Sequence, residues 1–477
     1  MEKSCPIHGT LIVPIARQRA TFELLERGCW AGGGATISEP QCPTACGLCA
    51  DHQSGTAVGL VEVTDACNLS CDVCFASAGP TAVAGPSRDE IRRRMRALRL
   101  ANRDRAPTTL QLIGGEPTLR SDLPELVGDA HALGFGWVHL ATNGVVLARD
   151  AALAARLASQ GLATLYLQFD GLHPYSTQTL RGRADLVELR LQALAHAGAA
   201  GIDRNLLVMT VTRDVNHHEL ADVIDFAVHE RATVAGVVFQ MMAQVGRQPR
   251  PDMPRETLCD FLEDVSEQTQ GRLQPADWLP YSLYTPLIRY LLESPLETEP
   301  AALVTPDPLC GLHAILIVDD DGTWRPLTHY LDPHVAALGL DARVAAELRP
   351  EGGLAALLMA PSGSAVAQHH RLLARQRLAG MLLASVTAAS RGFPPDWILR
   401  GLRDTGESLL AESLSLLSFL KASRRIVVLV AMDFMDASTY DFQRLRRCVV
   451  HYSDGAGVVP FCAMNTIRRR GMRVEGR

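Results

Sequence analysis

The feature that most constrains the fold is an alternation, from about residue 58, of short β-branched runs with longer amphipathic stretches. This alternation is typical of successive βα units, in which helices return the chain to the same edge of a parallel sheet. Helices are expected to begin near Ser87, Leu123, Asp150, Asp185 and His218. The expected strands are Val58–Thr64, Thr108–Ile113, Trp137–Thr142, Thr164–Phe169, Asn205–Thr212 and Val234–Met241.

Six such strands with five helices between them predict an α/β fold based on a partial (βα)6 TIM-like barrel, because right-handed crossovers curl the sheet. An open doubly wound sheet is the alternative. We expect a cysteine-rich metal module over residues 1–57, the barrel over residues 58–250, and an α+β accessory region over residues 251–477 that closes the barrel. Functional loops would then follow the carboxyl ends of the strands.

The rhythm of strands and helices ends after about residue 250. A turn at Asp319–Gly322 predicts a hairpin between Ile315–Val318 and Trp324–Leu327, and an Ala/Leu-rich region from Gly353 to Ser390 predicts helices. Ile426–Met432 is the last expected strand.

The chemistry of the chain is concentrated in its cysteines, eight of which fall within the first 74 residues. Cys67, Cys71 and Cys74 have C-x3-C-x2-C spacing directly after the first expected strand. Three thiolates on one short loop can bind three irons of a [4Fe-4S] cubane and leave the fourth iron open. A structural zinc site, the alternative, needs a fourth Cys or His, and none follows Cys74 closely.

The second expected strand ends in Gly114, Gly115, Glu116 and Pro117. Missing side chains at the glycines let a ligand approach the backbone, and the carboxylate can accept from an ammonium group. Further polar residues stand at later strand ends, where they can serve as cofactor or substrate contacts or as ordinary caps and turns. They are Thr142, Asn143, Gln168, Asp170 and Gln240.

Together these motifs resemble the radical S-adenosylmethionine (SAM) superfamily, in which the open iron binds SAM and a GGEP-type motif receives its amino group. Within it the chain is similar to the branch of the tetraether lipid synthases and the cobalamin-independent (class D) pterin methylases. The segments that carry this likeness are Cys5–Gly9, Cys42–Cys49 with His52, Glu62–Cys67, Leu167–Gly171, Arg181–Arg183, Val237–Gln240, Cys448–His451 and Pro460–Cys462.

The resemblance implies auxiliary iron sites, for which Cys42, Cys46 and Cys49 repeat the C-x3-C-x2-C spacing. A zinc site with His52 is the alternative there. The resemblance also implies metal ligands in the tail, at Cys448 and Cys462.

Four features depart from the pattern of the family or stand outside it. Ala57 stands where relatives carry a cysteine, and no Cys-x-x-Cys pair precedes the Cys5 segment with His8, so a rubredoxin-like iron site is not predicted. Cys310 and His313 replace a richer cysteine motif, and we expect Cys29 and Cys259 to be packed thiols.

Composition excludes some partners. The 46 basic and 52 acidic residues give a net charge of −6 without a long basic run, which argues against nucleic acid. No stretch approaches the length of an apolar membrane span, so we expect a cytoplasmic protein without an integral membrane segment.

The leading hypothesis is an enzyme that uses a [4Fe-4S] cluster and SAM to form carbon–carbon bonds, by methylation or one-carbon transfer to a small molecule. A methylene-folate-type carbon donor and a ferredoxin or flavodoxin as electron donor are implied by the resemblance. Alternatives are coupling of alkyl carbons in a lipid substrate, radical peptide modification or sulfur insertion, and a non-catalytic electron carrier.

Overall fold

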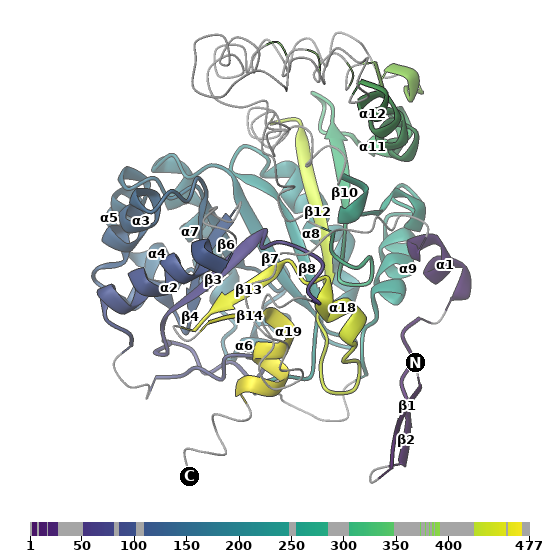
Figure 1. The fold of residues 1–477 in the computed structure, drawn as a ribbon. Helices are drawn as coiled ribbons and strands as arrows, with labels where there is room; N and C mark the ends of the chain where they lie inside the picture. The colour runs from purple at the N-terminus through teal and green to yellow at the C-terminus, as the bar shows by residue number, and fades with distance from the viewer. Residues whose placement is uncertain are drawn as a thin grey trace.

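The computed structural model describes residues 2–6, 9–16, 18–26, 51–80, 85–101, 109–247, 254–284, 305–347, 424–454 and 457–469, with single positions between 373 and 391. The predicted auxiliary ligands Cys42, Cys46 and Cys49 lie outside these residues, as do Cys29 and most of the helical region Gly353–Ser390. Figure 1 shows a sheet flanked by helices.

The centre of the molecule is a run of parallel strands in the order β8-β7-β6-β5-β4-β3. Each coincides with an expected strand to within one or two residues at either end. The bounds are β3 (Val58–Thr64), β4 (Thr109–Gly114), β5 (Val138–Thr142), β6 (Thr164–Gln168), β7 (Asn205–Val211) and β8 (Val234–Met241).

Helices return the chain between these strands, and two of them begin at side-chain caps. The Ser87 hydroxyl accepts from the Glu90 amide at 3.2 Å, and the Asp150 carboxylate accepts from the Leu153 amide at 3.0 Å. Two short helices, α4 and α6, were not expected. The helices are α2 (Arg88–Ala101), α3 (Leu123–Ala132), α4 (Val145–Arg149), α5 (Ala151–Ser159), α6 (Pro174–Arg181), α7 (Leu186–Ala199) and α8 (Leu220–His229).

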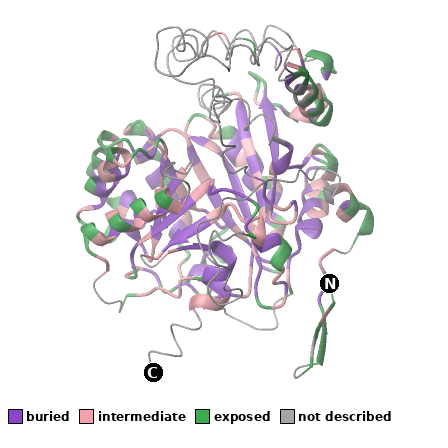
Figure 2. Cartoon of the chain, in the orientation of Figure 1, coloured by how far each residue is buried: buried purple, intermediate pink, exposed green. Residues whose placement is uncertain are grey.

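The main hydrophobic core lies on one face of this sheet. Alternate strand residues such as Leu110 and Leu112 belong to the same buried cluster as Ile91 and Met95 of α2. Figure 2 shows that most of the sheet is buried and that the helices covering it have exposed outer faces. Helices on a single face of a curved parallel sheet confirm the partial barrel and exclude the doubly wound alternative.

The sheet continues beyond the six expected strands through residues from the C-terminal half. Strand β12 (Ile426–Asp433) pairs in parallel with β8, and β13 (Val450–Ser453) pairs in parallel with β3. The expected hairpin is confirmed as β10 (Gly311–Val318) and β11 (Trp324–Pro326), with β10 antiparallel to β12. The C-terminal region therefore adds strands at both edges of the barrel, while the division at residues 57 and 250 stays a prediction.

The opposite, inner face of the sheet is partly filled by the end of the chain. Leu60 and Ile113 of that face form a second buried cluster with Met435, Tyr452 and Phe461. The segments involved are α18 (Phe442–Arg446), β14 (Val458–Pro460), α19 (Phe461–Ala463) and a π-helical turn, η6 (Met464–Arg468).

Further elements surround this core. The sequence did not predict the N-terminal hairpin β1 (Glu2–Cys5) and β2 (Gly9–Ile12), nor helix α1 (Arg19–Glu26), whose Thr21 donates to Glu263 at 2.5 Å. No helix among the described residues has the length and apolarity that crossing a bilayer requires. The remaining elements are η1 (Pro117–Leu119), η2 (His217–Glu219), α9 (Leu258–Gln268), η3 (Pro275–Asp277), β9 (Leu279–Pro280), η4 (Tyr281–Tyr284), α11 (Leu327–Tyr330) and α12 (Pro333–Glu347).

Candidate functional site

The three closely spaced cysteines lie on one loop, residues 67–79, which follows β3 at the carboxyl edge of the sheet; we call it the cysteine loop. Cys71 is buried at 8% exposure, and Cys67 and Cys74 are half-buried. All three pack against a small apolar cluster that contains Leu69 and Val145. The loop therefore holds its thiols at the rim of the barrel in a largely dry environment.

The thiols are close enough to influence one another. Burial raises the pKa of Cys67 to about 11, with smaller contributions from Glu116 and from the Cys71 and Cys74 thiolates. Nowhere in the described part of the chain do three Cys, His, Asp or Glu side chains converge on one point as a single metal ion requires. A cubane has a different requirement, because each of its irons takes a separate thiolate.

Gly114 and Gly115 are required by a close approach of the chain to itself. A Cβ at Gly114 would lie 2.2 Å from the Thr64 carbonyl oxygen, and one at Gly115 would lie 2.1 Å from that of Ala66. The Gly115 and Glu116 amides donate to these two carbonyls at 2.7 Å each. The space beside the glycines is thus filled by the end of β3 and the residues that lead into the cysteine loop, which the glycines allow to pack against β4.

Glu116 is the polar centre of this edge and is only 1% exposed. Its Oε1 accepts from the Thr118 amide, the Thr118 hydroxyl and the Thr142 hydroxyl at 3.1, 2.5 and 2.8 Å, and its Oε2 accepts from the Asn143 amide at 2.8 Å. Burial raises the pKa of this carboxyl, although the four hydrogen bonds oppose the rise. Because Oε2 has a single donor, it retains capacity for one more.

A further contact connects this group with the cysteine loop. The Asn143 amide nitrogen donates to the Asn68 side-chain oxygen at 2.7 Å, while the Asn143 oxygen accepts from the Val145 amide at 3.0 Å. The predicted residues Glu116, Thr142 and Asn143 are therefore brought together directly beside the cysteines.

Gln168 and Asp170, at the end of β6, belong to a buried charge network. Arg181 binds the Asp170 carboxylate through two hydrogen bonds of 2.8 and 2.6 Å, and Arg190 contacts it at 3.3 Å. Burial alone would raise the pKa of Asp170, but the two arginines lower it overall. Arg190 also donates to Gln168 at 2.7 Å.

Arg190 is the most unusual member of this network. Its side chain is 0% exposed, and its Nε and Nη1 atoms have no hydrogen-bond partner among the described residues. Unsatisfied buried donors on a cation are costly, so the site fits an anionic ligand. The guanidinium is close enough to Cys71 to lower the pKa of that thiol, which burial raises.

Gln240 stands apart from this network. It alternates along β8 with the core residues Phe239 and Met241, so it faces the inner side of the barrel. Its amide donates to the Tyr166 hydroxyl at 2.9 Å, and burial raises the pKa of that phenol. The two side chains form a polar pair on the concave face.

Cys448 and Cys462 lie close to Cys310, and we call these three the second cysteine group. Burial raises the pKa of Cys448 to about 12, and the nearby Cys310 thiolate adds to the rise. The pKa of Cys462 is raised mainly by burial and then by Cys448 and Cys310. Arg444, itself buried, donates to the Cys310 sulfur at 3.4 Å and to two main-chain carbonyls.

Two histidines stand next to this group. His52, the alternative zinc ligand of the sequence analysis, contacts the Cys448 carbonyl oxygen at 2.9 Å, and its ring lies 5.0 Å from that of His451. Burial lowers the pKa of His52 to about 4, so its ring is neutral at physiological pH. Cys259, by contrast, is packed in the main core, as expected.

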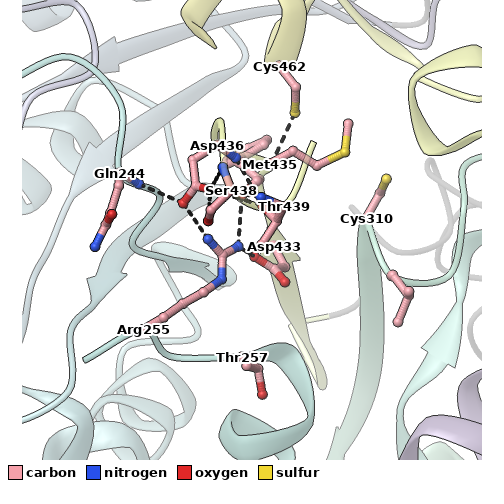
Figure 3. A network of polar contacts seen from close by, with 12 residues as sticks. Gln244, Arg255, Thr257, Cys310, Asp433, Met435, Asp436, Ser438, Thr439 and Cys462 are labelled. Carbon is pink, nitrogen blue, oxygen red and sulfur yellow. Dashed lines mark hydrogen bonds and ion pairs between the residues drawn. The ribbon is translucent and has the colours of Figure 1, made fainter. Parts of the chain in front are cut away.

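Figure 3 shows a polar network that links the second cysteine group to the loop after β8. Arg255 bridges Asp433, at 2.9 Å, and Asp436. Asp436 accepts from the Gln244 amide at 3.2 Å, and the neighbouring Met435 amide donates to the Cys462 sulfur at 3.4 Å.

Sequence reasoning missed Arg190 and Arg247, gave Arg181 no role beyond the family likeness, and did not predict the placement of Cys310. Arg181 and Arg247 donate to main-chain carbonyls of the cysteine loop, at Val73 and Cys71. Arginine is common on helices and loops, and no local pattern marks one that anchors a distant segment. The likeness of the motif around Cys310 to that of relatives was the one signal available for that residue.

Similarities to known proteins bear on the family of this chain. Residues 61–227 match the Radical SAM superfamily. The chain is 32% identical, over 434 residues, to a 7,8-dihydro-6-hydroxymethylpterin dimethyltransferase of Methanocaldococcus jannaschii, covering 90% of this chain and 80% of that protein. It is 30% identical over 208 residues to a probable GTP 3′,8-cyclase of Methanothermobacter marburgensis, covering 43% of this chain and 64% of the relative. A crystal structure of Streptococcus suis SuiB bound to S-adenosylmethionine aligns with 46% of this chain and 47% of SuiB, at 17% identity and a TM-score of 0.37.

Proposed function

We propose, from the premise that this chain belongs to the radical SAM superfamily, that Cys67, Cys71 and Cys74 hold its [4Fe-4S] cluster and that it transfers one carbon to a small molecule. Membership makes the protein a radical SAM enzyme. When bound, the cluster supplies the electron that cleaves SAM and releases the radical.

One observation carries the proposal: hydrogen bonds connect the loop that bears the three thiols with the Glu116 carboxylate at the rim of the barrel. Asn68 lies between Cys67 and the Asn143 amide, and the Asn143 backbone binds Glu116. The donor set fits the cluster, since three thiols on one loop match three irons and leave one iron open for SAM. The residues around it then orient the cofactor.

SAM has an ammonium and a carboxylate, and this edge offers a partner for each. We assign the ammonium to Glu116 Oε2, which accepts a single hydrogen bond at 2.8 Å. We assign the carboxylate to Arg190, whose Nε and Nη1 are buried without partners, together with Gln168. Gly114, Gly115, Thr142 and Asp170 contribute indirectly, by fixing the backbone and the two charged groups.

The reaction proposed is methylation at carbon, with a methylene-folate-type donor as the source of the carbon. Two facts support it: the identity with a pterin dimethyltransferase over most of both chains, and the Gln240–Tyr166 pair on the concave face. A polar pair in this position suits a small heterocycle with amide-like edges better than an alkyl chain, because both side chains can form further hydrogen bonds that an alkyl chain cannot provide.

Anaerobic reconstitution with SAM, a reductant and isotopically labelled one-carbon donors tests the proposal, with mass spectrometry of small-molecule and lipid extracts. We expect 5′-deoxyadenosine, and a product whose added carbon comes from the methylene donor. The Cys71→Ala variant, which lacks one proposed cluster ligand, is the negative control for SAM cleavage.

Other outcomes would overturn parts of it. Isotope label that enters the product from the SAM methyl group would refute the methylene donor as the source of the added carbon. A product that joins two existing alkyl carbons would favour lipid coupling instead, and detection of 5′-deoxyadenosine would exclude a non-catalytic electron carrier.

We also propose that the second cysteine group holds an auxiliary iron–sulfur cluster, separate from the predicted site on Cys42, Cys46 and Cys49. One buried and two half-buried thiols lie beside a buried guanidinium, and Cys310 raises the pKa of the other two. This arrangement favours bound metal over three neutral thiols, because thiolates bound to iron would balance the Arg444 charge. The electron donor would be a ferredoxin or flavodoxin, and we place the protein in the cytoplasm, where thiols stay reduced.

A further inference from the structure

The cysteine loop is clamped by a segment that follows β8, at residues 242–247. Cys74 and Arg247 form an antiparallel bridge, with hydrogen bonds of 3.1 and 2.8 Å between their backbones. Gly246, at φ +66°, lies so close that a Cβ there would be 2.4 Å from the Cys74 carbonyl oxygen. This segment is therefore built against the third cysteine.

The Arg247 side chain strengthens the clamp. Its Nε donates to the Cys71 carbonyl at 2.5 Å and its Nη2 donates to the Ala78 carbonyl at 2.9 Å. One guanidinium thus fixes two points of the cysteine loop, one of them at a cysteine. A planar fork with several donors is suited to this role in a way that a lysine ammonium is not.

Arg181 also donates a hydrogen bond to this loop, but unlike Arg247 it is paired with a carboxylate. It donates to the Val73 carbonyl at 2.7 Å, while the Asp170 carboxylate binds it through two hydrogen bonds and offsets its charge. Arg247 has no carboxylate partner within ion-pair distance in the described part of the chain. Its charge therefore acts on the cysteine loop with no carboxylate counter-ion among the described residues.

Reduction of a cluster adds a negative charge, and a fixed positive charge nearby stabilises the reduced form. Net charge and hydrogen bonding around a cluster are among the factors that set its reduction potential. We propose that Arg247 is a positioning residue that holds the cysteine loop in its cluster-binding shape and raises the reduction potential of the [4Fe-4S] cluster through its uncompensated charge. This inference rests on the proposed assignment of the cluster to Cys67, Cys71 and Cys74.

The test is a redox titration of the reconstituted full-length protein, followed by the EPR signal of the reduced cluster, together with the rate of iron loss to a chelator. We expect Arg247→Met to disfavour one-electron reduction by about tenfold, or about 59 mV. Arg247→Lys keeps the charge but not the fork, so its potential should stay near wild type. Both variants should lose iron faster. Arg156→Met, which removes an exposed charge on α5, is the control and should change neither reading.

Each result decides the inference. The inference is overturned if the cluster of Arg247→Met has the wild-type reduction potential. It is also overturned if Arg247→Lys shifts the reduction potential as much as Arg247→Met does. If Arg247→Met assembles no cluster, the inference requires Arg247→Lys to assemble one near the wild-type potential, and failure to do so overturns it. A wild-type chain that holds no cluster on Cys67, Cys71 and Cys74 would instead overturn the proposed function.

Discussion

The cysteine loop and the second cysteine group each bring three thiols together, but the first does so within one short segment and the second through the fold of distant segments. Cys67, Cys71 and Cys74 share one short segment, whereas Cys310 is more than a hundred residues from Cys448 and Cys462. The loop is shaped by close backbone contacts with β4 and with Arg247, at the rim of the barrel. The second group exists only because β10 and β12 join the sheet and carry their ends toward the C-terminal segment. The first site is local and its stability depends little on the core, while the second depends on the whole C-terminal half.

The largest effect expected from this comparison is on SAM cleavage. Replacing Cys67, Cys71 or Cys74 by Ala should abolish formation of 5′-deoxyadenosine, because the cluster loses an iron ligand. The melting temperature should change little, since these side chains lie outside the main core. Chromatographic assay of 5′-deoxyadenosine and calorimetry measure the two effects. A variant that cleaves SAM at the wild-type rate would contradict the assignment.

Measurements of iron content should distinguish the cysteine loop from the second cysteine group. The reconstituted protein should hold more than one cubane, and Cys310→Ser, Cys448→Ser or Cys462→Ser should each remove about four irons per chain. Cys259→Ser is the matched control, because Cys259 is a buried thiol in the main core and away from both sites. Iron analysis with Mössbauer spectroscopy measures the change. Equal iron in all four variants would show that the second cysteine group binds no cluster.

Stability should also distinguish the two regions. Arg444→Met removes the donor to the Leu309 and Asp433 carbonyls, at 2.9 and 2.6 Å, and to the Cys310 sulfur. Buried carbonyls left without a donor should lower the free energy of unfolding by about 3 kcal/mol. Arg446→Met, at an exposed pair with Asp51, should lower it by less than about 0.5 kcal/mol. Denaturant titration measures both, and similar losses in the two variants would argue against a special role for Arg444.

The same contrast explains what the sequence could reveal. Strands β3 and β8 match their predicted bounds because each is a mostly apolar run with buried residues on both faces, as is typical of parallel strands. Strand β13 went unpredicted because it is only four residues long and joins the sheet by pairing with β3, from the opposite end of the chain. No local pattern encodes such a pairing.

The candidate site likewise contains features that a local sequence pattern reveals and features that only the folded chain reveals. The thiol spacing and the Gly-Gly-Glu turn are local, so they could be recognised, yet the reason for the glycines could not. The atoms beside Gly114 and Gly115 belong to Thr64 and Ala66, which only the folded chain brings there. Arg181, Arg190 and Arg247 act on carbonyls and carboxylates from other segments, and their role follows from geometry alone.

The smallest expected effect concerns Glu256, which follows Arg255 in the segment that links the two regions. Its carboxylate accepts from Arg213 at 2.7 Å, and burial raises its pKa to about 7, with the Arg213 charge opposing the rise. An unfolded glutamate titrates near about 4.3, so between these values the folded chain binds the extra proton. Stability should therefore fall as the pH rises from about 5 to about 7 and then level off, by about 2 kcal/mol after allowance for solvent screening.

Glu256→Gln removes the titrating group but keeps an acceptor for Arg213, which also retains its 2.9 Å contact with Asp264. The variant should lose most of this pH dependence, because no proton remains to be exchanged at that site on unfolding. Glu267→Gln, on the exposed side of α9, should leave the wild-type profile unchanged. Urea unfolding at a series of pH values measures all three proteins. If the wild type and Glu256→Gln show the same slope, the burial of Glu256 does not govern the pH dependence of stability.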